Sequence, residues 1–497
     1  MLTTQEIKTF IDNDAASRKK HLAKVGVRYY EADHDIKDYR IFFVNADGKL
    51  EEDKLKSNIK ISHPFFTELV DQLVQYMLSG KDGFVRSKIP ELQEQLDIYF
   101  NDNEDFLAEL EELLTGTAVK GFENMYAYKN AEGLTAFQCA DSLGVVECKA
   151  KETDDGCEYV IYWYVDRIGK ARKEIKRIEV WDDKVTWFYV QEGDGAIVLD
   201  DSQKLNPRPH AIYRKDGDDA IYYEDFGFIP FFRLDYNRKQ YSSLKPIKPL
   251  IDDYDLMACG LSNNIQDSNE VLYVVKGFQG DNLDELHMNT KTKKLIGIPD
   301  AEGGVEIQTI DIPYQARQAK LELDEKSIYR FGMGFNSAQL GDGNITNVII
   351  KSRYTLLDLK ANKLQDRLKQ FLRKLLKIVL AEINDLHGTD YKQKDVYFNF
   401  EREIMTNAAD NAQIELTDAQ KQQTQVTTLL NLATYLGDEL LMQNICDVLD
   451  LDYNDIVDKL PKREQDDLYA AQAALNGIVP EDDPAPDDPI VVKGFTA

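Results

Sequence analysis

The sequence has no apolar run long enough to cross a membrane, and its first six residues (MLTTQE) lack the basic and apolar regions of a signal peptide. We therefore expect a protein that is made, and stays, in a cytoplasm. Basic residues are also in deficit, because 60 lysines and arginines face 88 acidic residues and leave a net charge of -28. This balance argues against ordinary nucleic-acid binding, which relies on basic surface to neutralise phosphates. It is compatible with letting a polyanion pass, since like charges keep the polymer off the walls.

Cysteines and catalytic motifs are scarce as well. Five cysteines, an odd number, suit a reducing compartment. Cys139, Cys148 and Cys157 follow one another at nine-residue steps, but no CxxC pair and no nearby histidine supports a zinc site. We interpret them as buried or half-buried thiols. No P-loop, GxSxG or HExxH motif occurs, so we predict a protein that is not an enzyme and uses no cofactor or metal.

The chain of 497 residues (57.0 kDa) is long enough for roughly two to four packed units. Residues 4–23 predict one polar helix, and residues 45–48 (NADG) predict a turn. Pro64 is placed to begin a helix that ends at Gly80, and we interpret His63 as a surface or capping residue rather than a ligand. Residues 91–120 are helical and acidic in pattern.

The composition then changes to segments rich in aromatic and β-branched residues, which predict antiparallel strands. They are residues 158–165, 174–180, 185–191 and 211–223. The β segment closes with an aromatic cluster at 227–232 (GFIPFF). Such a cluster can stack bases, but without interleaved lysines and arginines we interpret it as hydrophobic core.

A second long helix is predicted to begin at Pro246 and Pro249 and to end at Gly277. One side carries five acids, Asp252, Asp253, Asp255, Asp267 and Glu270, which we interpret as a solvated face. A metal cluster is disfavoured because adjacent helical residues point to different sides and no histidine completes a shell. Residues 278–313 predict a small α/β insertion, and residues 315–331 a third helix that returns from it.

The chain is organised around the stretch from Gly332 to Leu386, where a glycine-rich break leads into one long helical pattern. Its apolar stripe is Ile350, Tyr354, Leu357, Ala361, Leu364, Leu368, Leu372, Leu375, Val379, Ile383 and Leu386. Lysines and arginines, Lys360 among them, crowd the remaining surface. Such a helix spans roughly 60 Å. Two interpretations stay open from pattern alone: a structural helix with a solvated basic face, or a helix that packs against copies of itself in a ring.

Beyond the long helix the pattern is simpler. Residues 395–401 predict a strand and residues 411–474 predict helices. Residues 480–489 form an acidic, proline-rich tail that we expect to be disordered.

The order of several short motifs resembles the portal proteins of long-tailed bacteriophages. The motifs are Asn58-Ile59-Lys60, Phe65-Phe66, Leu69-Val70, residues 76–80, residues 227–232 with Asn237, Ser243-Leu244-Lys245-Pro246 running into residues 250–255, Ile328-Tyr329-Arg330, and Gly343-Asn344 before the lysine-rich helix. The resemblance covers residues 2–401 in order, and the helical C-terminal part fits by position only. Each motif alone is weak, whereas their order and spacing together are specific.

The resemblance implies an α+β, mainly helical subunit of a twelve-fold ring at one capsid vertex, assembled in a bacterial cytoplasm and carried in the virion. Residues 1–245 would form the wing, 246–277 and 314–335 the stem helices, 278–313 the clip, 336–347 the tunnel loop, 348–408 the long wing helix and a strand, 409–478 the crown, and 479–497 the acidic tail. The ring would be the channel for DNA packaging and ejection.

The implied partners are further copies of the chain, the terminase large subunit, the head-tail adaptor protein, the major capsid and scaffolding proteins, and double-stranded DNA that passes without sequence specificity. No membrane is involved. The residues implied at the DNA channel are Asn336, Gln339, Gly341, Asp342, Gly343, Asn344, Thr346, Asn347 and Lys351. Those implied in clip docking are Lys291, Lys293, Lys294 and Glu302.

Two other classes of protein remain as alternatives. A cytoplasmic metal-dependent nuclease or other phosphodiesterase, or a phosphatase, would use the acid clusters, and calorimetric binding of divalent cations would favour it. A monomeric helical adaptor or scaffold would explain the amphipathic helices without any channel.

Overall fold

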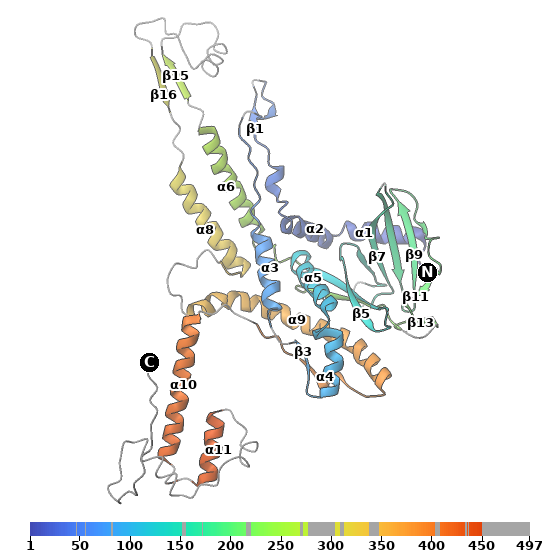
Figure 1. The fold of residues 1–497 in the computed structure, drawn as a ribbon. Helices are drawn as coiled ribbons and strands as arrows, with labels where there is room; N and C mark the ends of the chain where they lie inside the picture. Colours follow the sequence, from blue (N-terminus) through green and yellow to red (C-terminus); the bar gives the residue numbers. More distant parts are fainter. Residues whose placement is uncertain are drawn as a thin grey trace, which may run out of the picture. The chain divides into compact units, whose positions relative to one another are not determined.

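The computed structural model describes residues 1–45, 47–54, 56–80, 83–151, 156–170, 172–214, 220–268, 272–276, 304–308, 313–336, 347–402, 408–432, 435 and 437–449. The chain forms two compact units. The first comprises Met1–Gly343 and Lys351–Ile404, and the second Asn344–Ile350 and Met405–Ala497. Figure 1 shows their elements, and each unit is described by itself. The mixed α and β architecture of the chain agrees with the predicted fold class.

The N-terminus forms two helices, α1 (Thr4–Ala15) and α2 (Arg18–Tyr30). The prediction of one helix over residues 4–23 is therefore wrong. The Ser17 side chain accepts a hydrogen bond from the backbone N–H of Lys20 at 3.4 Å and so begins a new helix, as a serine at this position commonly does. After a 3-10 turn (Asp35–Asp38), strands β1 (Phe42–Val44) and β2 (Leu50–Glu52) pair as a hairpin around the predicted turn.

Three helices then build much of the first unit's core. The helix predicted between Pro64 and Gly80 is confirmed as α3 (Phe65–Met77). The acidic stretch contains α4 (Pro90–Leu96), a π-helical turn (Asp97–Asn101) and α5 (Glu104–Lys120). Helix α5 ends at Gly121, whose φ of +91° places it in the left-handed region that glycine tolerates best.

Antiparallel strands make up the β part of this unit. One sheet has the order β10 (Val198–Leu199), β9 (Val185–Glu192), β8 (Lys173–Trp181), β7 (Tyr159–Ile168) and β6 (Val145–Cys148), with β11 (Arg208–Pro209) also pairing with β9. The predicted strands over residues 158–165, 174–180 and 185–191 are confirmed as β7, β8 and β9. Residues 211–223 form not one strand but two, β12 (Ala211–Tyr213) and β13 (Tyr222–Glu224).

A smaller sheet, absent from the predictions, has the order β14 (Phe231–Asp235), β4 (Phe122–Lys129) and β5 (Thr135–Ala140). Strand β4 lacks the polar and apolar alternation of a half-exposed strand because both of its faces are largely covered. The rings of Tyr126, Tyr162, Trp181 and Phe231 contact one another between the two sheets. The prediction that residues 227–232 are hydrophobic core holds in part, because Phe231 and Phe232 pack half-buried against the cores whereas Phe228 is 40% exposed.

Helices α6 (Lys248–Ser268) and α8 (Tyr314–Gly332) form an antiparallel pair, and strands β15 (Leu272–Lys276) and β16 (Gly304–Gln308) follow and precede them (Figure 1). The predicted helix at 315–331 is confirmed. The predicted helix end at Gly277 is wrong, because residues 272–276 (LYVVK) are strand. Their β-branched and aromatic side chains favour the extended form, and β16 supplies the hydrogen-bond partners.

The long helix α9 (Asn347–His387) has 41 residues, as the apolar period predicts. Its stripe from Leu357 to Ile383 is buried, with at most 2% of any stripe side chain exposed, and Leu386 at the end is 50% exposed. This stripe packs with α3, α4 and α5 in the largest hydrophobic core, and α1 covers a second core on the larger sheet. Strand β17 (Val396–Phe398) falls inside the predicted strand and pairs with β3 (Val85–Ser87).

The second unit contains helices α10 (Ala408–Asn431) and α11 (Asp438–Val448), which fall inside the stretch predicted to be helical. Within it Leu441 and Cys446 are buried. The rest of the predicted helical stretch, from residue 450, and the acidic tail lie outside the described residues.

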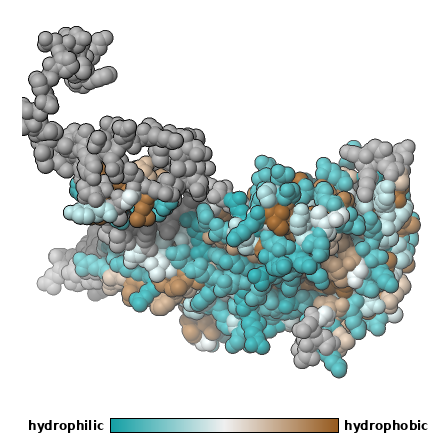
Figure 2. All heavy atoms as spheres, turned by 90° about the horizontal axis from the view of Figure 1, so that it is seen from below, coloured by the Kyte–Doolittle hydropathy of each residue, from teal (hydrophilic) through white to brown (hydrophobic). Residues whose placement is uncertain are grey.

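Among the described residues, no helix is long and apolar enough to span a membrane. In the face shown in Figure 2 the described surface is mostly hydrophilic, with hydrophobic side chains in separate small patches.

Candidate functional site

The feature that positions the predicted channel loop is the α8–α9 junction, which we define as residues 329–336 together with the parts of α3 and α9 that contact them. Helix α8 ends at Met333, whose φ of +56° is left-handed and whose N–H bonds back to the carbonyls of Arg330 and Tyr329. The N–H of Gly334 also donates to the carbonyl of Tyr329, at 3.0 Å. The helix therefore stops at a defined residue.

Two glycines allow this turn to lie directly against α3. A Cβ atom on Gly332 would lie 2.6 Å from Leu69 Cδ1, and one on Gly334 would lie 2.0 Å from Leu69 Cδ2. Leu69 is itself buried in the main core, so it has little room to move. The glycines are thus required by close packing against Leu69.

The side chain of Gln72 holds the next residue by both of its backbone groups. Its Nε2 donates to the carbonyl oxygen of Phe335 at 2.8 Å, and its Oε1 accepts from the N–H of Phe335 at 3.0 Å. The Phe335 ring also stacks on Tyr354 of α9, with ring centres 4.8 Å apart. The chain entering the loop is thereby held between α3 and α9.

Lys360 of α9 is the buried charge of the junction. Its Nζ donates to the carbonyl oxygen of Gly332 at 2.9 Å, and only 7% of the residue is exposed. Burial lowers the pKa of this ammonium to about 8. The prediction that Lys360 belongs to the solvated basic surface of the helix is therefore wrong.

A second polar link joins α3 to α9 one helical turn after Gln72 on α3. The Tyr76 hydroxyl donates to Asp358 Oδ1 at 2.6 Å, and Arg402 Nη1 lies 3.3 Å from the same oxygen. Burial and the hydrogen bond to Asp358 raise the pKa of Tyr76, so the phenol stays protonated and keeps donating. The link adds to the apolar attachment between α3 and α9.

Most residues predicted for the channel loop lie outside the described residues, namely Gln339, Gly341, Asp342, Gly343, Asn344 and Thr346. Asn336 is described, and its Nδ2 donates to Glu325 Oε1 of α8 at 2.8 Å. Asn347 and Lys351 lie in the first turns of α9. The predicted docking residues Lys291, Lys293, Lys294 and Glu302 also lie outside the described residues.

Helix α6 is attached to an extended segment, residues 57–63, that runs antiparallel along it. The N–H groups of Ser57, Ile59, Ile61 and His63 donate in turn to Asp267 Oδ1, Asn263 Oδ1, Cys259 Sγ and Asp255 Oδ1 at 2.6–3.2 Å. Every second strap residue meets every fourth residue of α6 because two extended residues advance by about 6.6 Å and four helical residues by about 6.0 Å. We call residues 57–63 the α6 strap.

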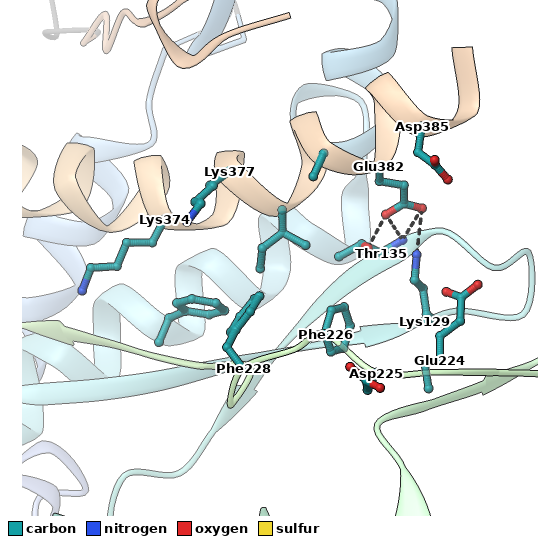
Figure 3. Close-up of a pocket in the computed structure, with 14 residues that line it drawn as sticks. Lys129, Thr135, Glu224, Asp225, Phe226, Phe228, Lys374, Lys377, Glu382 and Asp385 are labelled. Carbon is teal, nitrogen blue, oxygen red and sulfur yellow. Dashed lines mark hydrogen bonds and ion pairs between the residues drawn. The ribbon is translucent and has the colours of Figure 1, made fainter. Parts of the chain in front are cut away.

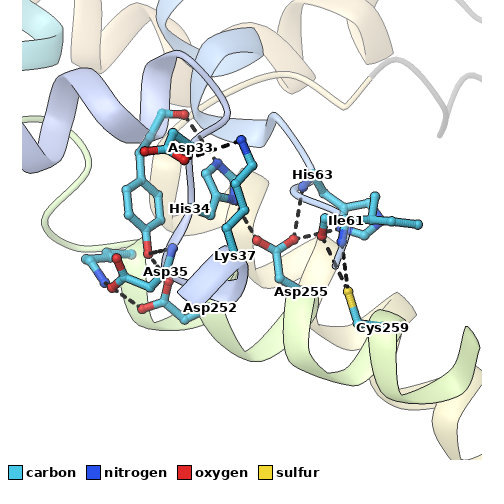
Figure 4. A network of polar contacts seen from close by, with 11 residues as sticks. Asp33, His34, Asp35, Lys37, Ile61, His63, Asp252, Asp255 and Cys259 are labelled. Atoms are coloured by element: carbon cyan, nitrogen blue, oxygen red, sulfur yellow. Dashed lines mark hydrogen bonds and ion pairs between the residues drawn. The ribbon is translucent and has the colours of Figure 1, made fainter. Parts of the chain in front are cut away.

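Asp255 lies at the His63 end of the strap (Figure 4) and is fully buried. Its carboxylate binds His34 Nδ1 at 2.6 Å and His63 Nδ1 at 2.7 Å. Burial alone would raise its pKa, but the hydrogen bonds from His34 and His63 outweigh it and hold the pKa of Asp255 below its ordinary value. The predicted solvated face is therefore wrong here, and His63 is a partner of this buried acid rather than a surface residue.

The neighbouring acids of α6 are also paired. Asp252 accepts the Tyr29 hydroxyl and lies 2.8 Å from Lys248 Nζ, which also lies 2.6 Å from Asp35 (Figure 4). Asp253 points to another side of the helix and contacts Lys320 Nζ of α8 at 2.5 Å. These acids hold α6 to its neighbours within the subunit.

A cavity of about 540 Å³ lies between α9 and the smaller sheet (Figure 3). Lys374, Lys377, Phe226 and Phe228 line it, and at one end Glu382 accepts hydrogen bonds from Thr135 and lies 3.2 Å from Lys129 Nζ. The Glu382 contacts attach α9 to the sheet.

The three cysteines at nine-residue steps are free thiols, Cys148 buried and Cys139 and Cys157 half-buried, as predicted. Burial raises the pKa of all three, so they are poor thiolate ligands and nucleophiles. Within the described part of the chain, no group of three or more histidine, cysteine or acidic residues could hold a metal ion. The acid clusters considered for a phosphodiesterase therefore form no metal site there.

Sequence reasoning missed Gln72 and Lys360. Lys360 carried a usable signal, because it lies three residues after Leu357 and four before Leu364, at the border of the buried stripe. Gln72 had none, since its partner Phe335 is 263 residues away in the chain.

The described residues thus assemble an antiparallel helix pair, a fixed turn after α8 and the 41-residue helix α9. A family model described as "Phage portal protein, SPP1 Gp6-like" matches residues 9–439, and the chain belongs to this family. The chain is 26% identical to the portal protein of Bacillus phage SPP1 over 393 residues, 78% of this chain and 75% of that protein. It is 26% identical to the portal protein of Clostridium phage phiCD119 over 427 residues, 82% of this chain and 88% of that protein.

The resemblance drawn from the motifs is thereby confirmed. The protein is a structural, non-enzymatic component of the virion, located at the capsid vertex as the channel for DNA packaging and ejection. The alternatives of a phosphodiesterase or a helical adaptor are set aside.

Proposed function

We propose that this chain forms a homododecameric ring in which α6 and α8 are the stem, residues 278–313 the clip, residues 336–347 the tunnel loop and residues 409–478 the crown. The observation that carries the proposal is the α8–α9 junction. There the chain is held by Gln72 and Lys360 immediately before the predicted tunnel loop, and the 41-residue α9 follows that loop. A loop tied to a stem helix at one end and a long helix at the other can respond to motion of either.

The tunnel loop would touch the phosphate backbone of passing DNA without reading bases. Asn344 and Thr346 are the proposed contacts, with Asn336, Gln339, Gly341, Asp342, Gly343, Asn347 and Lys351 in or beside the same loop. The net charge of -28 supports transit rather than retention, because the bulk of the protein repels the polyanion. Local polar contacts could then yield as the duplex moves.

The clip would dock the terminase large subunit during packaging and the head-tail adaptor afterwards. Lys291, Lys293, Lys294 and Glu302 are the proposed contact residues. Major capsid and scaffolding proteins would surround the ring at the vertex. Replacing the three lysines by glutamine should weaken binding of both docking partners in a pull-down, whereas Lys363→Gln, on the exposed surface of α9, should not.

The ring is tested by light scattering after gel filtration and by negative-stain microscopy of the purified protein. We expect closed rings of roughly twelve chains with a central hole, a cyclic assembly built from one heterologous interface. A stable monomer at both low and high protein concentration would contradict the proposal.

The loop assignment is tested separately, in rings that assemble normally. Replacing Asn344 and Thr346 together by alanine should lower the amount of DNA packaged per head. The matched control is Thr9→Ala, an exposed position of α1. Unchanged packaging by the loop variant would show that these two residues are not the DNA contacts.

A further inference from the structure

We propose that neighbouring subunits of the ring join through two specific surfaces: the N-terminal ribbon of one copy and the exposed stripe of α8 on the next copy. The N-terminal ribbon is the hairpin β1–β2 with its flanking residues Tyr39 and Ile61. The α8 stripe is Ala316, Ala319 and Leu323, followed by Lys326 and Arg330. The inference rests on the proposed ring, and it assigns the occupant of each surface.

The hairpin is small and exposed, and within one subunit its apolar face has no packing partner among the described residues. All six residues of β1 and β2 are exposed. The register pairs Phe42 with Glu52 and Val44 with Leu50, so Phe42, Val44 and Leu50 share one face. They are 56%, 65% and 72% exposed. An isolated two-stranded hairpin is marginally stable in water, and a packing partner on its apolar face would stabilise it.

The ribbon continues this apolar surface toward the α6 strap. Tyr39 is 44% exposed and Ile61 is 48% exposed. Hydrogen bonds from the strap to Asp267, Asn263, Cys259 and Asp255 hold the backbone of residues 57–63 on α6, so Ile61 is presented on a rigid element. Apolar groups that stay in water on a rigid element are typical of a protein interface.

The α8 stripe is also an exposed surface with an apolar centre. Ala316, Ala319, Leu323, Lys326 and Arg330 are all exposed and follow one another by three or four residues, so they lie on one side of the helix. Leu323 is 60% exposed. The two small residues beside Leu323 leave room for a neighbouring chain to approach the helix closely.

The two surfaces lie on opposite flanks of α6, as a ring requires. Helix α6 contacts α8 through Asp253 and Lys320, and it contacts the strap through Asp255. Two residues along a helix correspond to a turn of about 200° around its axis, so these contacts are on opposite sides. Figure 1 shows α6 between α8 and the hairpin. A heterologous ring joins such unlike surfaces from copy to copy.

Charge favours the same pairing. The hairpin and its turn, residues 42–53, carry four acids against Lys49, namely Asp47, Glu51, Glu52 and Asp53. Arg40 pairs with Glu52 at 3.4 Å, which leaves Asp47 and Glu51 as acids available to a neighbouring copy. The α8 stripe ends in Lys326 and Arg330, both exposed. Opposite charges at the edge of this interface would attract the hairpin of one copy to α8 of the next and fix the orientation in which they meet. Two hairpins, or two α8 stripes, would instead place like charges against each other.

The test uses full-length protein that carries a photo-crosslinking amino acid in place of Leu323. Rings are isolated by gel filtration, checked by negative-stain microscopy, irradiated, and digested for mass spectrometry. We expect cross-links from α8 of one copy to residues 39–61 of another, and a covalent ladder of oligomers on denaturing gels. The same amino acid in place of Gln318, which points about 140° away from Leu323 around α8, should give no such ladder.

Paired substitutions test the energetics without the probe. Leu50→Asp and Leu323→Asp should each raise the protein concentration needed for ring formation by about tenfold or more, because each places a charge at the apolar contact. Phe43→Asp, on the other face of the hairpin, and Gln318→Asp, on another side of α8, are the matched controls and should have a much smaller effect. Circular dichroism of each monomer keeps loss of folding apart from loss of assembly.

The outcomes separate this inference from the proposed function. Closed rings whose cross-links from position 323 go elsewhere, or rings unaffected by Leu50→Asp and Leu323→Asp, would overturn the assigned interface and leave the portal ring standing. Failure of the unmodified protein to form rings at any concentration would overturn the ring itself.

Discussion

The ammonium of Lys360 donates a 2.9 Å hydrogen bond to the carbonyl oxygen of Gly332, and so ties α9 to the last residue of α8. The group is buried among apolar neighbours of the main core, and its pKa is lowered to about 8 by that burial. A charged lysine at this place costs stability, which the hydrogen bond to Gly332 offsets only in part. The bond is thus a specific link between the two elements on either side of the proposed tunnel loop.

Because Lys360 is buried, the free energy of unfolding should rise with pH between about 8 and about 10.4. An unfolded lysine titrates near about 10.4, whereas folded Lys360 titrates at about 8. Between these values the unfolded chain holds a proton that the folded chain has lost, so the free energy of unfolding increases with pH, by about 3 kcal/mol in total. In Lys360→Met this contribution should be absent.

Guanidinium unfolding at about pH 7.5 and about pH 10 measures the effect as a difference between wild type and variant. Lys363→Met, three residues further on and exposed, is the control and should keep the wild-type rise. An equal pH dependence in the Lys360→Met variant and the wild type would show that Lys360 does not titrate in this range.

The glycines at the junction should couple to Leu69. Gly334→Ala places a Cβ 2.0 Å from Leu69 Cδ2 and should cost about 1–3 kcal/mol of unfolding free energy. Leu69→Ala alone should cost about 2–5 kcal/mol. The double variant should cost at least about 1 kcal/mol less than the sum, because the smaller side chain relieves the clash.

Chemical denaturation of the four proteins completes this cycle. Gly156→Ala is the control, since a Cβ there meets nothing within 4 Å, and it should change stability by less than about 0.5 kcal/mol. Strict additivity of the two changes would mean that Leu69 is not what excludes a side chain at residue 334.

Asp255 should be the main polar anchor of α6. Asp255→Asn keeps the shape but removes the charge that His34 and His63 share, and should cost about 3 kcal/mol at neutral pH. Because the folded pKa of Asp255 is lowered, its contribution is present above the unfolded value near about 3.9 and is lost as pH falls through the folded value. The difference between wild type and variant should therefore shrink in acid.

Thermal or denaturant unfolding from neutral to acidic pH follows that difference. Glu322→Gln, an exposed carboxylate on α8, is the matched control and should have little effect at any pH. A difference between wild type and Asp255→Asn that grows in acid would contradict the proposed anchor.

Glu382 should fasten α9 to the smaller sheet. Its carboxylate accepts the N–H of Thr135 at 3.1 Å from both oxygens and lies 3.2 Å from Lys129 Nζ (Figure 3). Glu382→Gln should cost about 1–2 kcal/mol and speed hydrogen exchange at the Thr135 amide, since charge-assisted bonds are lost. Asp385→Asn, exposed one turn later, should leave that exchange rate unchanged. Equal exchange in both variants would argue against Glu382 as the attachment.

Local pattern predicted the helices that carry one continuous buried stripe. Helix α9 is the clearest case, because its apolar residues recur every three or four positions and each turn repeats the same surface. The end of α6 was missed because the apolar residues Leu272 and Val275 continue a helical spacing, while their pairing with β16 depends on a segment about thirty residues further on. Strand β4 was missed because a strand covered on both faces has no alternation to read.

The candidate site likewise has features that the sequence predicted and features that it did not. The order of motifs was enough to place the chain among portal proteins. The roles of individual polar residues could not be predicted from the sequence. Asp255 is one of several acids on a helix, and its partners His34 and His63 are 221 and 192 residues distant. Lys360 is one of many lysines on α9, and only packing against Gly332 distinguishes it.

The sequence by itself therefore determined the family, the long helix and the glycine-marked break before it, because backbone periodicity and motif order are local properties of the chain. The tertiary structure alone decided which charges are buried and what holds them. Burial and hydrogen bonding depend on groups brought together from distant segments, and the free energy of a charge is set by those surroundings rather than by its neighbours in sequence.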